Sequence, residues 1–212
     1  MVAQSLFAER GIDGVTVADI TVAAGQSNRS AVNYHFGGKD GLVEAVLEGH
    51  QPGIESRRLE LIADIEGKGR PTLRDWVRTL VLPLGELLDD AAGVAYLRIV
   101  AQLIGHPRLV VLGHHRAAVE QGGDRILAAL GRARESNRKL WLSRWILVTG
   151  SIFHGLADYA RMREEDRDSL PAPEEFIDEL IDAVTALIRS PSSSTTKKAR
   201  RTGPGRKTRR NK

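Results

Sequence analysis

Residues 11–42 read GIDGVTVADITVAAGQSNRSAVNYHFGGKDGL, and this stretch decides the fold because a glycine-containing turn separates two short helical patterns. Thr16 precedes the first pattern, and Asp19 follows three residues later, as in a capping box. Val17, Ile20 and Ala23 recur at helical spacing, and Ala24-Gly25 ends the pattern. The sequence therefore predicts a helix from Thr16 to about Ala24.

The second pattern predicts a short helix that begins at Ser27 or Asn28, both good N-cap residues, and runs to about His35. Its inner face is expected to carry Val32 and Phe36, which are four residues apart. Together the two helices predict a helix-turn-helix, in which the second helix enters the major groove of DNA.

The outward positions of the second helix suit contacts with DNA. Arg can read guanine and Asn can read adenine, each through two hydrogen bonds, which gives base contacts to Asn28, Arg29 and Asn33. Hydroxyl, imidazole and ammonium groups suit phosphate oxygens, as does a threonine at a helix N-terminus. The candidate DNA-binding residues are Thr16, Ser27, Asn28, Arg29, Ser30, Asn33, Tyr34, His35 and Lys39.

The flanking sequence predicts helices on both sides of this motif. A first helix is expected to run to about Arg10 and to end at Gly11. Lys39 is expected to start a longer helix, which Pro52 kinks or interrupts. We expect a DNA-binding domain over residues 1–48, a helical domain over 49–189 and a disordered tail over 190–212.

The rest of the chain also has apolar residues at helical spacing, without alternating runs joined by a hairpin turn, so the predicted fold class is all-α. Further helices are expected at about 72–89, 93–104, 107–134, 138–164 and 173–189. The last two have wide apolar faces, composed of Trp141, Trp145, Val148, Ile152, Leu156 and Tyr159 in one and Phe176, Ile177, Leu180, Ile181, Val184, Leu187 and Ile188 in the other. These faces either fill the core or form the self-complementary surface of a homodimer.

Composition narrows the function classes. The chain has no cysteine, which removes thiol nucleophiles and thiolate metal sites. Its histidines lack the spacing of a metal site, and phosphate-binding loops, nucleophile elbows and dinucleotide fingerprints are missing from the sequence. No window approaches the roughly 18 apolar residues of a membrane span. We therefore expect a cytoplasmic protein that is not an enzyme and needs no metal or cofactor.

Charge is distributed unevenly along the chain. Residues 190–212 contain nine Lys or Arg and no acidic residue. Of the 31 basic and 27 acidic residues in the chain, 22 basic and 27 acidic ones therefore lie in residues 1–189, whose net charge is about −5. Residues 1–48 carry three basic and six acidic residues, a net charge of −3. The tail either binds DNA nonspecifically, as a flexible polycation does, or serves as a solubilising extension, and an acidic membrane surface is a further alternative.

Several blocks in order resemble the DNA-binding region of the TetR family of repressors. They are Leu6-Phe7-Ala8-Glu9-Arg10-Gly11, Thr16-Val17-Ala18-Asp19-Ile20, Ala23-Ala24-Gly25 and Asn33-Tyr34-His35-Phe36-Gly37-Gly38-Lys39-Asp40-Gly41-Leu42. The resemblance covers about residues 1–48. It implies a dimer of all-helical subunits, each with a three-helix DNA-binding unit and a C-terminal domain that binds a small molecule and changes the spacing of the two reading heads.

The helical domain has side chains suited to a hydrophobic or amphipathic ligand. The candidates are Trp76, Tyr96, Gln102, Trp141, Trp145 and Phe153, which alternatively fill the core. The sequence thus predicts a transcriptional regulator, acting as a repressor, that binds a near-palindromic operator as a dimer through helices 138–164 and 173–189 and is released by a ligand. Two rivals remain. One is a nonspecific architectural DNA-binding protein driven by its tail, and the other is a helical ligand-binding or enzymatic module whose N-terminal unit has lost DNA binding.

Overall fold

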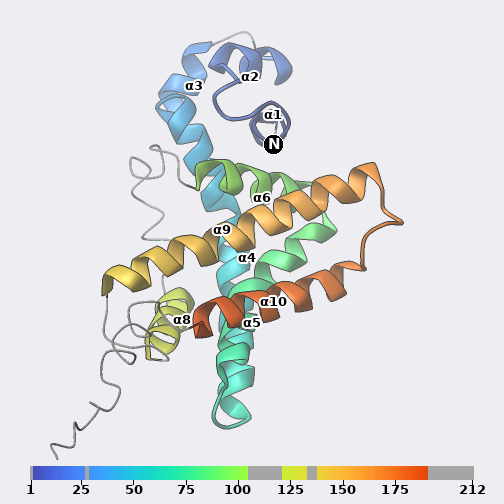
Figure 1. The fold of residues 1–212 in the computed structure, drawn as a ribbon. Coiled ribbons are helices and arrows are strands. Elements are labelled where there is room, and N and C mark those ends of the chain that lie inside the picture. Colours follow the sequence, from blue (N-terminus) through green and yellow to red (C-terminus); the bar gives the residue numbers. More distant parts are fainter. Residues whose placement is uncertain (1, 27–28, 105–120, 133–137, 191–212) are drawn as a thin grey trace, which may run out of the picture.

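A computed structural model describes residues 2–26, 29–104, 121–132 and 138–190, and the secondary structure in these ranges is helical throughout (Figure 1). The α-helices are α1 Val2–Arg10, α2 Val17–Ala23, α3 Arg29–Phe36, α4 Lys39–Gly67, α5 Leu73–Gly85, α6 Ala91–Leu103, α8 Gln121–Arg132, α9 Arg138–Glu165 and α10 Pro173–Arg189, and a 3₁₀ helix, η1, spans Glu86–Asp89. The predicted all-α class is confirmed.

The first three helices and the start of α4 form a small unit at one end of the molecule (Figure 1). Phe7, Ile20 and Val43 are buried at its centre. The first helix ends where expected, because Gly11 adopts a left-handed conformation with φ 81° and donates its N–H to the carbonyl of Phe7 at 3.1 Å. This unit is the predicted three-helix arrangement.

Helix α4 runs unbroken through Pro52, so the interruption expected there does not occur. A proline within a helix costs about 3 kcal/mol, since it removes one backbone hydrogen bond and crowds the preceding turn. Burial of Leu47 and Ile54 on either side offsets this cost. The boundary expected after residue 48 lies inside α4, and the two units therefore share one helix backbone.

The larger unit is a bundle in which α9 and α10 form an antiparallel hairpin (Figure 1). Helix α10 packs against α5 and α9, and α6 packs against α9 on one side and α1 on the other. The expected helix at 72–89 is present as α5 followed by the 3₁₀ turn η1. Of the helix expected at 107–134, α8 is the described part, and residues 105–120 and 133–137 lie outside the described ranges.

The apolar face predicted on residues 141–159 turns inward. Val148, Ile152, Leu156 and Tyr159 are buried, and Trp141 and Trp145 are half-buried against the same core. Of the two interpretations left open for this face, core packing is therefore the one observed. The outer surface of α9 has a different apolar set, Leu142, Ile146 and Leu147, which are 61%, 58% and 60% exposed.

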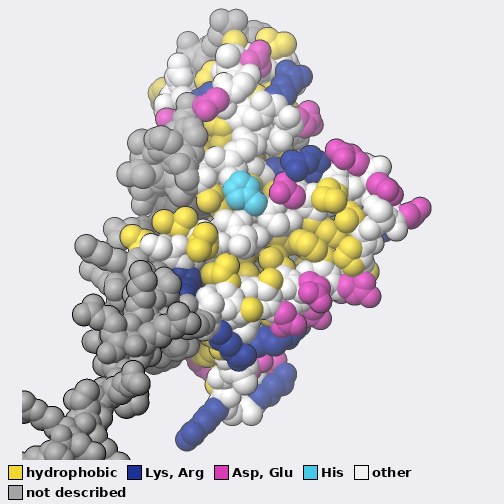
Figure 2. Space-filling model, viewed as in Figure 1, with side chains coloured by type: hydrophobic (Ala, Val, Ile, Leu, Met, Phe, Trp, Pro, Cys, Tyr) yellow, Lys and Arg dark blue, Asp and Glu magenta, His cyan; other side chains and the backbone are white. Residues whose placement is uncertain are grey.

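Figure 2 shows hydrophobic side chains gathered along α9 and between α9 and α10, with charged side chains toward the margins. In the described part of the chain, no helix is both long and apolar enough to cross a membrane.

Candidate nucleic-acid interface

The helix-turn-helix begins with a complete capping box. The Thr16 backbone N–H and hydroxyl donate to Asp19 Oδ2 at 2.8 and 2.6 Å, and the Asp19 N–H donates to Thr16 Oγ1 at 3.2 Å. At the other end of α2, Gly25 adopts φ 65° and donates its N–H to the Val22 carbonyl at 3.0 Å. Both ends of α2 were predicted, and the two caps satisfy the Asp19 N–H at the start and the Val22 carbonyl at the end.

Helix α3 presents three of the predicted contact residues to solvent. Asn33, Tyr34 and His35 are exposed, and Tyr34 is 86% exposed, an unusual exposure for an aromatic side chain. The rings of Tyr34 and His35 meet edge to face, with centroids 5.1 Å apart. Amide, phenol and imidazole groups are thus available together on one short helix.

The other predicted residues of this segment are described less fully. Ser27 and Asn28 lie outside the described residues, and Arg29 and Ser30 form the first turn of α3, with side chains that are also outside the description. Phe36 departs from its predicted place on the inner face, because it is the last residue of α3 and its ring is 41% exposed at the edge of the unit. Val32 does pack against the core.

The hydroxyl of Thr16 is used in capping α2. Its hydroxyl hydrogen points to Asp19, whose carboxylate places a negative charge at the N-terminus of α2. A negative charge there stabilises the helix by interacting with the positive end of its dipole, and it repels a phosphate at the same place. A phosphate contact through Thr16 therefore requires its hydroxyl to turn away from Asp19.

Lys39 points inward and holds the loop before α2. Its ammonium donates to the carbonyl oxygens of Ile12 and Val15 at 2.9 and 3.0 Å. The side chain is half-buried, and two of its three donors are used. The first role of Lys39 is thus to fix the α1–α2 loop against the start of α4.

Replacing this lysine tests that role without DNA. Lys39→Met keeps the length of the side chain and removes both charged hydrogen bonds, so we expect the free energy of unfolding to fall by roughly 1.5–3 kcal/mol. Urea denaturation of the free protein measures this change. Arg10→Met, which removes an exposed cation from the same unit, is the control and should stay within about 0.5 kcal/mol of the parent. Equal stability of the two variants would return Lys39 to the list of freely available phosphate ligands.

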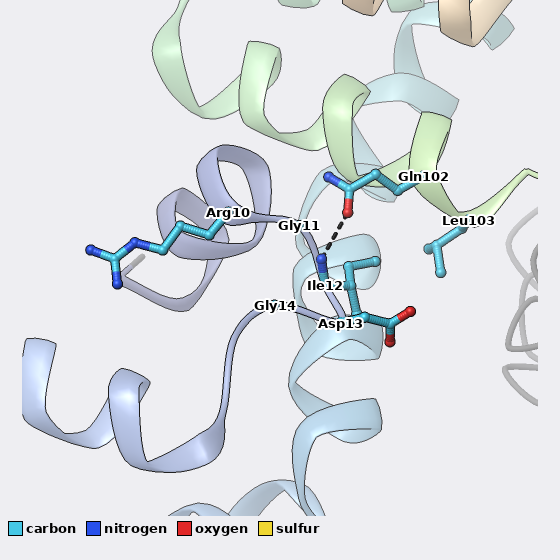
Figure 3. A pocket seen from close by; sticks show the side chains of 7 residues that line it. All are labelled: Arg10, Gly11, Ile12, Asp13, Gly14, Gln102 and Leu103. Atoms are coloured by element: carbon cyan, nitrogen blue, oxygen red, sulfur yellow. Dashed lines mark hydrogen bonds between the residues drawn. The ribbon is translucent and has the colours of Figure 1, made fainter.

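A glutamine of α6 joins the larger unit to the small unit formed by α1, α2, α3 and the start of α4 (Figure 3). Gln102 Oε1 accepts the Ile12 N–H at 2.8 Å, and its Nε2 donates to the Phe7 carbonyl at 3.0 Å. Gly11 lies beside this amide, and a Cβ there would be 3.7 Å from Gln102 Oε1. The end of α1 and the following loop are thereby tied to the last turn of α6.

A cavity of about 270 Å³ opens at this junction. It is lined by Arg10, Gly11, Ile12, Asp13, Gly14, Gln102 and Leu103 (Figure 3). Gln102 was predicted as a ligand-binding residue within the helical domain. Its side chain instead faces the small unit and satisfies the Ile12 N–H and the Phe7 carbonyl there.

The remaining predicted ligand residues belong to the core of the bundle or pack against it. Tyr96 is 2% exposed and packs on His50, with ring centroids 4.7 Å apart, while its hydroxyl accepts from Gln51 Nε2 at 3.3 Å. Burial raises the pKa of Tyr96 to about 12. The other four, Trp76, Trp141, Trp145 and Phe153, are half-buried against the core.

Sequence reasoning missed the residues that connect the two units. Gln4 of α1 is 5% exposed and donates to the Ala92 carbonyl at the start of α6 at 2.7 Å. Gln102 fastens the opposite end of α6 to the end of α1, so α1 is held to α6 at two points. No local pattern marks these glutamines, although a buried glutamine in the first helix requires a hydrogen-bond partner elsewhere in the fold.

The N-terminal residues match a known family. Residues 2–46 match the family described as "Bacterial regulatory proteins, tetR family". A comparison with curated proteins finds no match.

Solved structures resemble the whole chain at low identity. A protein of Clostridium perfringens, named as a candidate fatty acid metabolism regulator, is 22% identical with a TM-score of 0.53, covering 87% of this chain and 94% of its own. The ketosteroid transcriptional regulator KstR2 of Mycobacterium tuberculosis is 18% identical with a TM-score of 0.48, covering 88% and 89%. The TetR family transcriptional regulator PfmR of Thermus thermophilus is 14% identical with a TM-score of 0.47, covering 90% and 94%.

The likeness to the Clostridium perfringens protein shows that the two chains share a fold. The matched residues span α1, the capped α2, the turn at Gly25, the exposed α3 and the start of α4. Residues 2–46, which contain this helix-turn-helix, thus match the tetR family of bacterial regulatory proteins.

Proposed function

We propose that this chain is a transcriptional repressor that binds a near-palindromic operator as a homodimer and is released by a small-molecule ligand. The observation that carries the proposal is the exposed polar surface of α3, with Asn33, Tyr34 and His35 together on a helix that packs against α2 and α4. A helix with such side chains fits the major groove, where amide groups read base edges and hydroxyl groups contact phosphates.

The dimer surface that we propose is the outer side of α9 with α10. Leu142, Ile146 and Leu147 form an exposed apolar row on α9, and an apolar row on a helix is typical of a partner surface. Helices α9 and α10 lie away from α3, so a two-fold axis through them leaves both reading helices free (Figure 1). Two copies of α3 would then enter successive major grooves about one helical turn apart.

The ligand in this proposal binds between helices of the larger unit, near Tyr96 and the half-buried tryptophans. Release of DNA requires that the ligand bind more tightly to a conformation whose head spacing does not fit the operator. The two glutamine contacts of α1 with α6 supply a connection through which such a conformation would reach the DNA-binding unit.

A titration with DNA tests the function. The full chain and residues 1–189 are titrated against duplex from the gene's own upstream region and against a scrambled duplex, at two salt concentrations. Preference of both forms for the upstream duplex supports a specific regulator. Binding that ignores sequence and disappears with residues 190–212 would instead identify an architectural protein driven by its basic tail. No binding by either form, even at low salt, would identify a helical module without DNA function.

The reading helix can be tested one residue at a time. We expect Asn33→Ala to reduce affinity for the specific duplex by about 1–3 kcal/mol and to relax the preference at one base position, since two hydrogen bonds to a base edge are lost. Competition titrations with single-base operator variants measure both effects. Val22→Ala, which shortens an exposed side chain of α2, is the matched control. An unchanged base preference in Asn33→Ala would remove this residue from base reading.

A further inference from the structure

A histidine, a glutamine and a backbone carbonyl meet where α1, α4 and α6 come together. Gln4 Nε2 lies 2.7 Å from the Ala92 carbonyl oxygen of α6 and 2.9 Å from Nε2 of His50 on α4. Gln4 is buried, and His50 is half-buried with its ring over Tyr96. One amide nitrogen thus joins the DNA-binding unit to two helices of the larger unit.

This geometry determines that Nε2 of His50 carries no proton. A carbonyl oxygen only accepts, so the Gln4 atom near Ala92 must be the nitrogen, and His50 Nε2 must accept its other hydrogen. Protonation of His50 places an N–H against this donor. Rotating the Gln4 amide by half a turn does not relieve the conflict, because its oxygen would then face the Ala92 oxygen. The observed contact therefore requires neutral His50.

The groups around His50 favour the same state. Burial lowers the pKa of His50, and the positive amino terminus of the chain acts in the same direction, whereas Asp90 raises the pKa and does not outweigh burial. The Asp90 carboxylate is also engaged as the N-cap of α6, accepting the Gly93 N–H at 2.8 Å. From α6, the phenol of Tyr96 stays neutral because its pKa is about 12, and Gln51 beside it on α4 has no charge.

We propose that His50 and Gln4 form a proton-sensitive latch, which holds the DNA-binding unit to α4 and α6 while His50 is neutral and opens when His50 is protonated. The latch itself stands on the contacts of α1 alone. Its effect on DNA affinity rests on the proposed function. When α1 is released from α6, the position of α3 is less well defined, and the two copies of α3 in a dimer fit the two half-sites less well.

The direction of the pH effect follows from the lowered pKa. In the unfolded chain His50 has its ordinary pKa of 6.5, and in the folded chain it has a lower one, so the unfolded chain binds more protons between these values. The stability that neutral His50 contributes to the folded chain is therefore fully present above about pH 6.5, and it is lost as the pH falls through the pKa of His50 in the folded chain. Because one proton is linked to the opening of this contact, the equilibrium constant for opening changes by at most about tenfold per pH unit.

The test compares the full-length wild type with His50→Gln and His154→Gln. Glutamine can present an amide oxygen to Gln4 and does not titrate, and His154 is an exposed histidine of α9 that serves as the matched control. Two quantities are measured from about pH 7.5 to about pH 5.5 at fixed salt, a range that spans histidine titration. They are amide hydrogen exchange of residues 2–10 without DNA, corrected for intrinsic rates, and affinity for the upstream duplex.

We expect wild type and His154→Gln to show several-fold faster exchange of α1 and several-fold weaker DNA binding at the acidic end, and His50→Gln to show neither. His35 is present in all three proteins and therefore does not affect the differences between them. Gln4→Met is a second variant that lacks the donor, and its α1 should exchange rapidly with little dependence on pH.

The same acid dependence of α1 exchange in His50→Gln as in wild type would overturn the latch. If the proteins bind no duplex at any pH, the proposed function fails, and the exchange of α1 still decides the latch by itself.

Discussion

Gly41→Ala is expected to displace α3 from α4 and to abolish the preference for operator DNA. A Cβ on Gly41 would lie 1.5 Å from the carbonyl oxygen of Phe36, which is backbone and has no rotamer to move away. Relief requires the end of α3 to shift, so we expect a loss of about 3 kcal/mol or more in the free energy of unfolding. Denaturant unfolding and DNA titration of the same preparation measure the two effects.

Gly49→Ala is the matched control for this substitution. Gly49 lies in the same helix, α4, and nothing is within 4 Å of the Cβ that alanine would add. Alanine there should stabilise the helix by about 0.5–1 kcal/mol, because glycine loses more conformational entropy on folding. If Gly41→Ala behaved like Gly49→Ala, the close approach of α3 to α4 would not be what positions the reading helix.

Ile146→Glu is expected to convert the proposed dimer into monomers. Ile146 lies in the middle of the exposed apolar row on α9, where a carboxylate in a buried interface would be unpaired and costly. Because two linked reading heads bind far more tightly than one, affinity for the near-palindromic duplex should fall by about 10²–10⁴-fold. Sedimentation velocity and DNA titration are the measurements.

Val22→Glu controls for the general effect of a charge on an exposed apolar position. Val22 is 74% exposed on α2, outside the proposed dimer surface, so this variant should sediment like the wild type. A dimeric Ile146→Glu would place the subunit contact on another surface.

The sequence by itself determined the elements of the DNA-binding unit. The Thr16–Asp19 capping box, the turn at Gly25 and the end of α1 at Gly11 were all predictable, because each depends on hydrogen bonds between residues three or four apart and on the conformational freedom of glycine. Helical periodicity similarly predicted α9 and α10, since the spacing of apolar residues is itself a local property.

The tertiary structure decided which groups meet. Lys39 was predicted on the DNA side and points instead to carbonyls 24 and 27 residues away, Gln102 contacts a carbonyl 95 residues away, and Gln4 meets a histidine 46 residues away. The packing of the helices also buries Val148 in the core, places Trp141 half-buried against it and leaves Ile146 exposed. Local patterns carry no information on such pairings, because a polar group finds its partner and an apolar face its neighbour only when distant helices pack together.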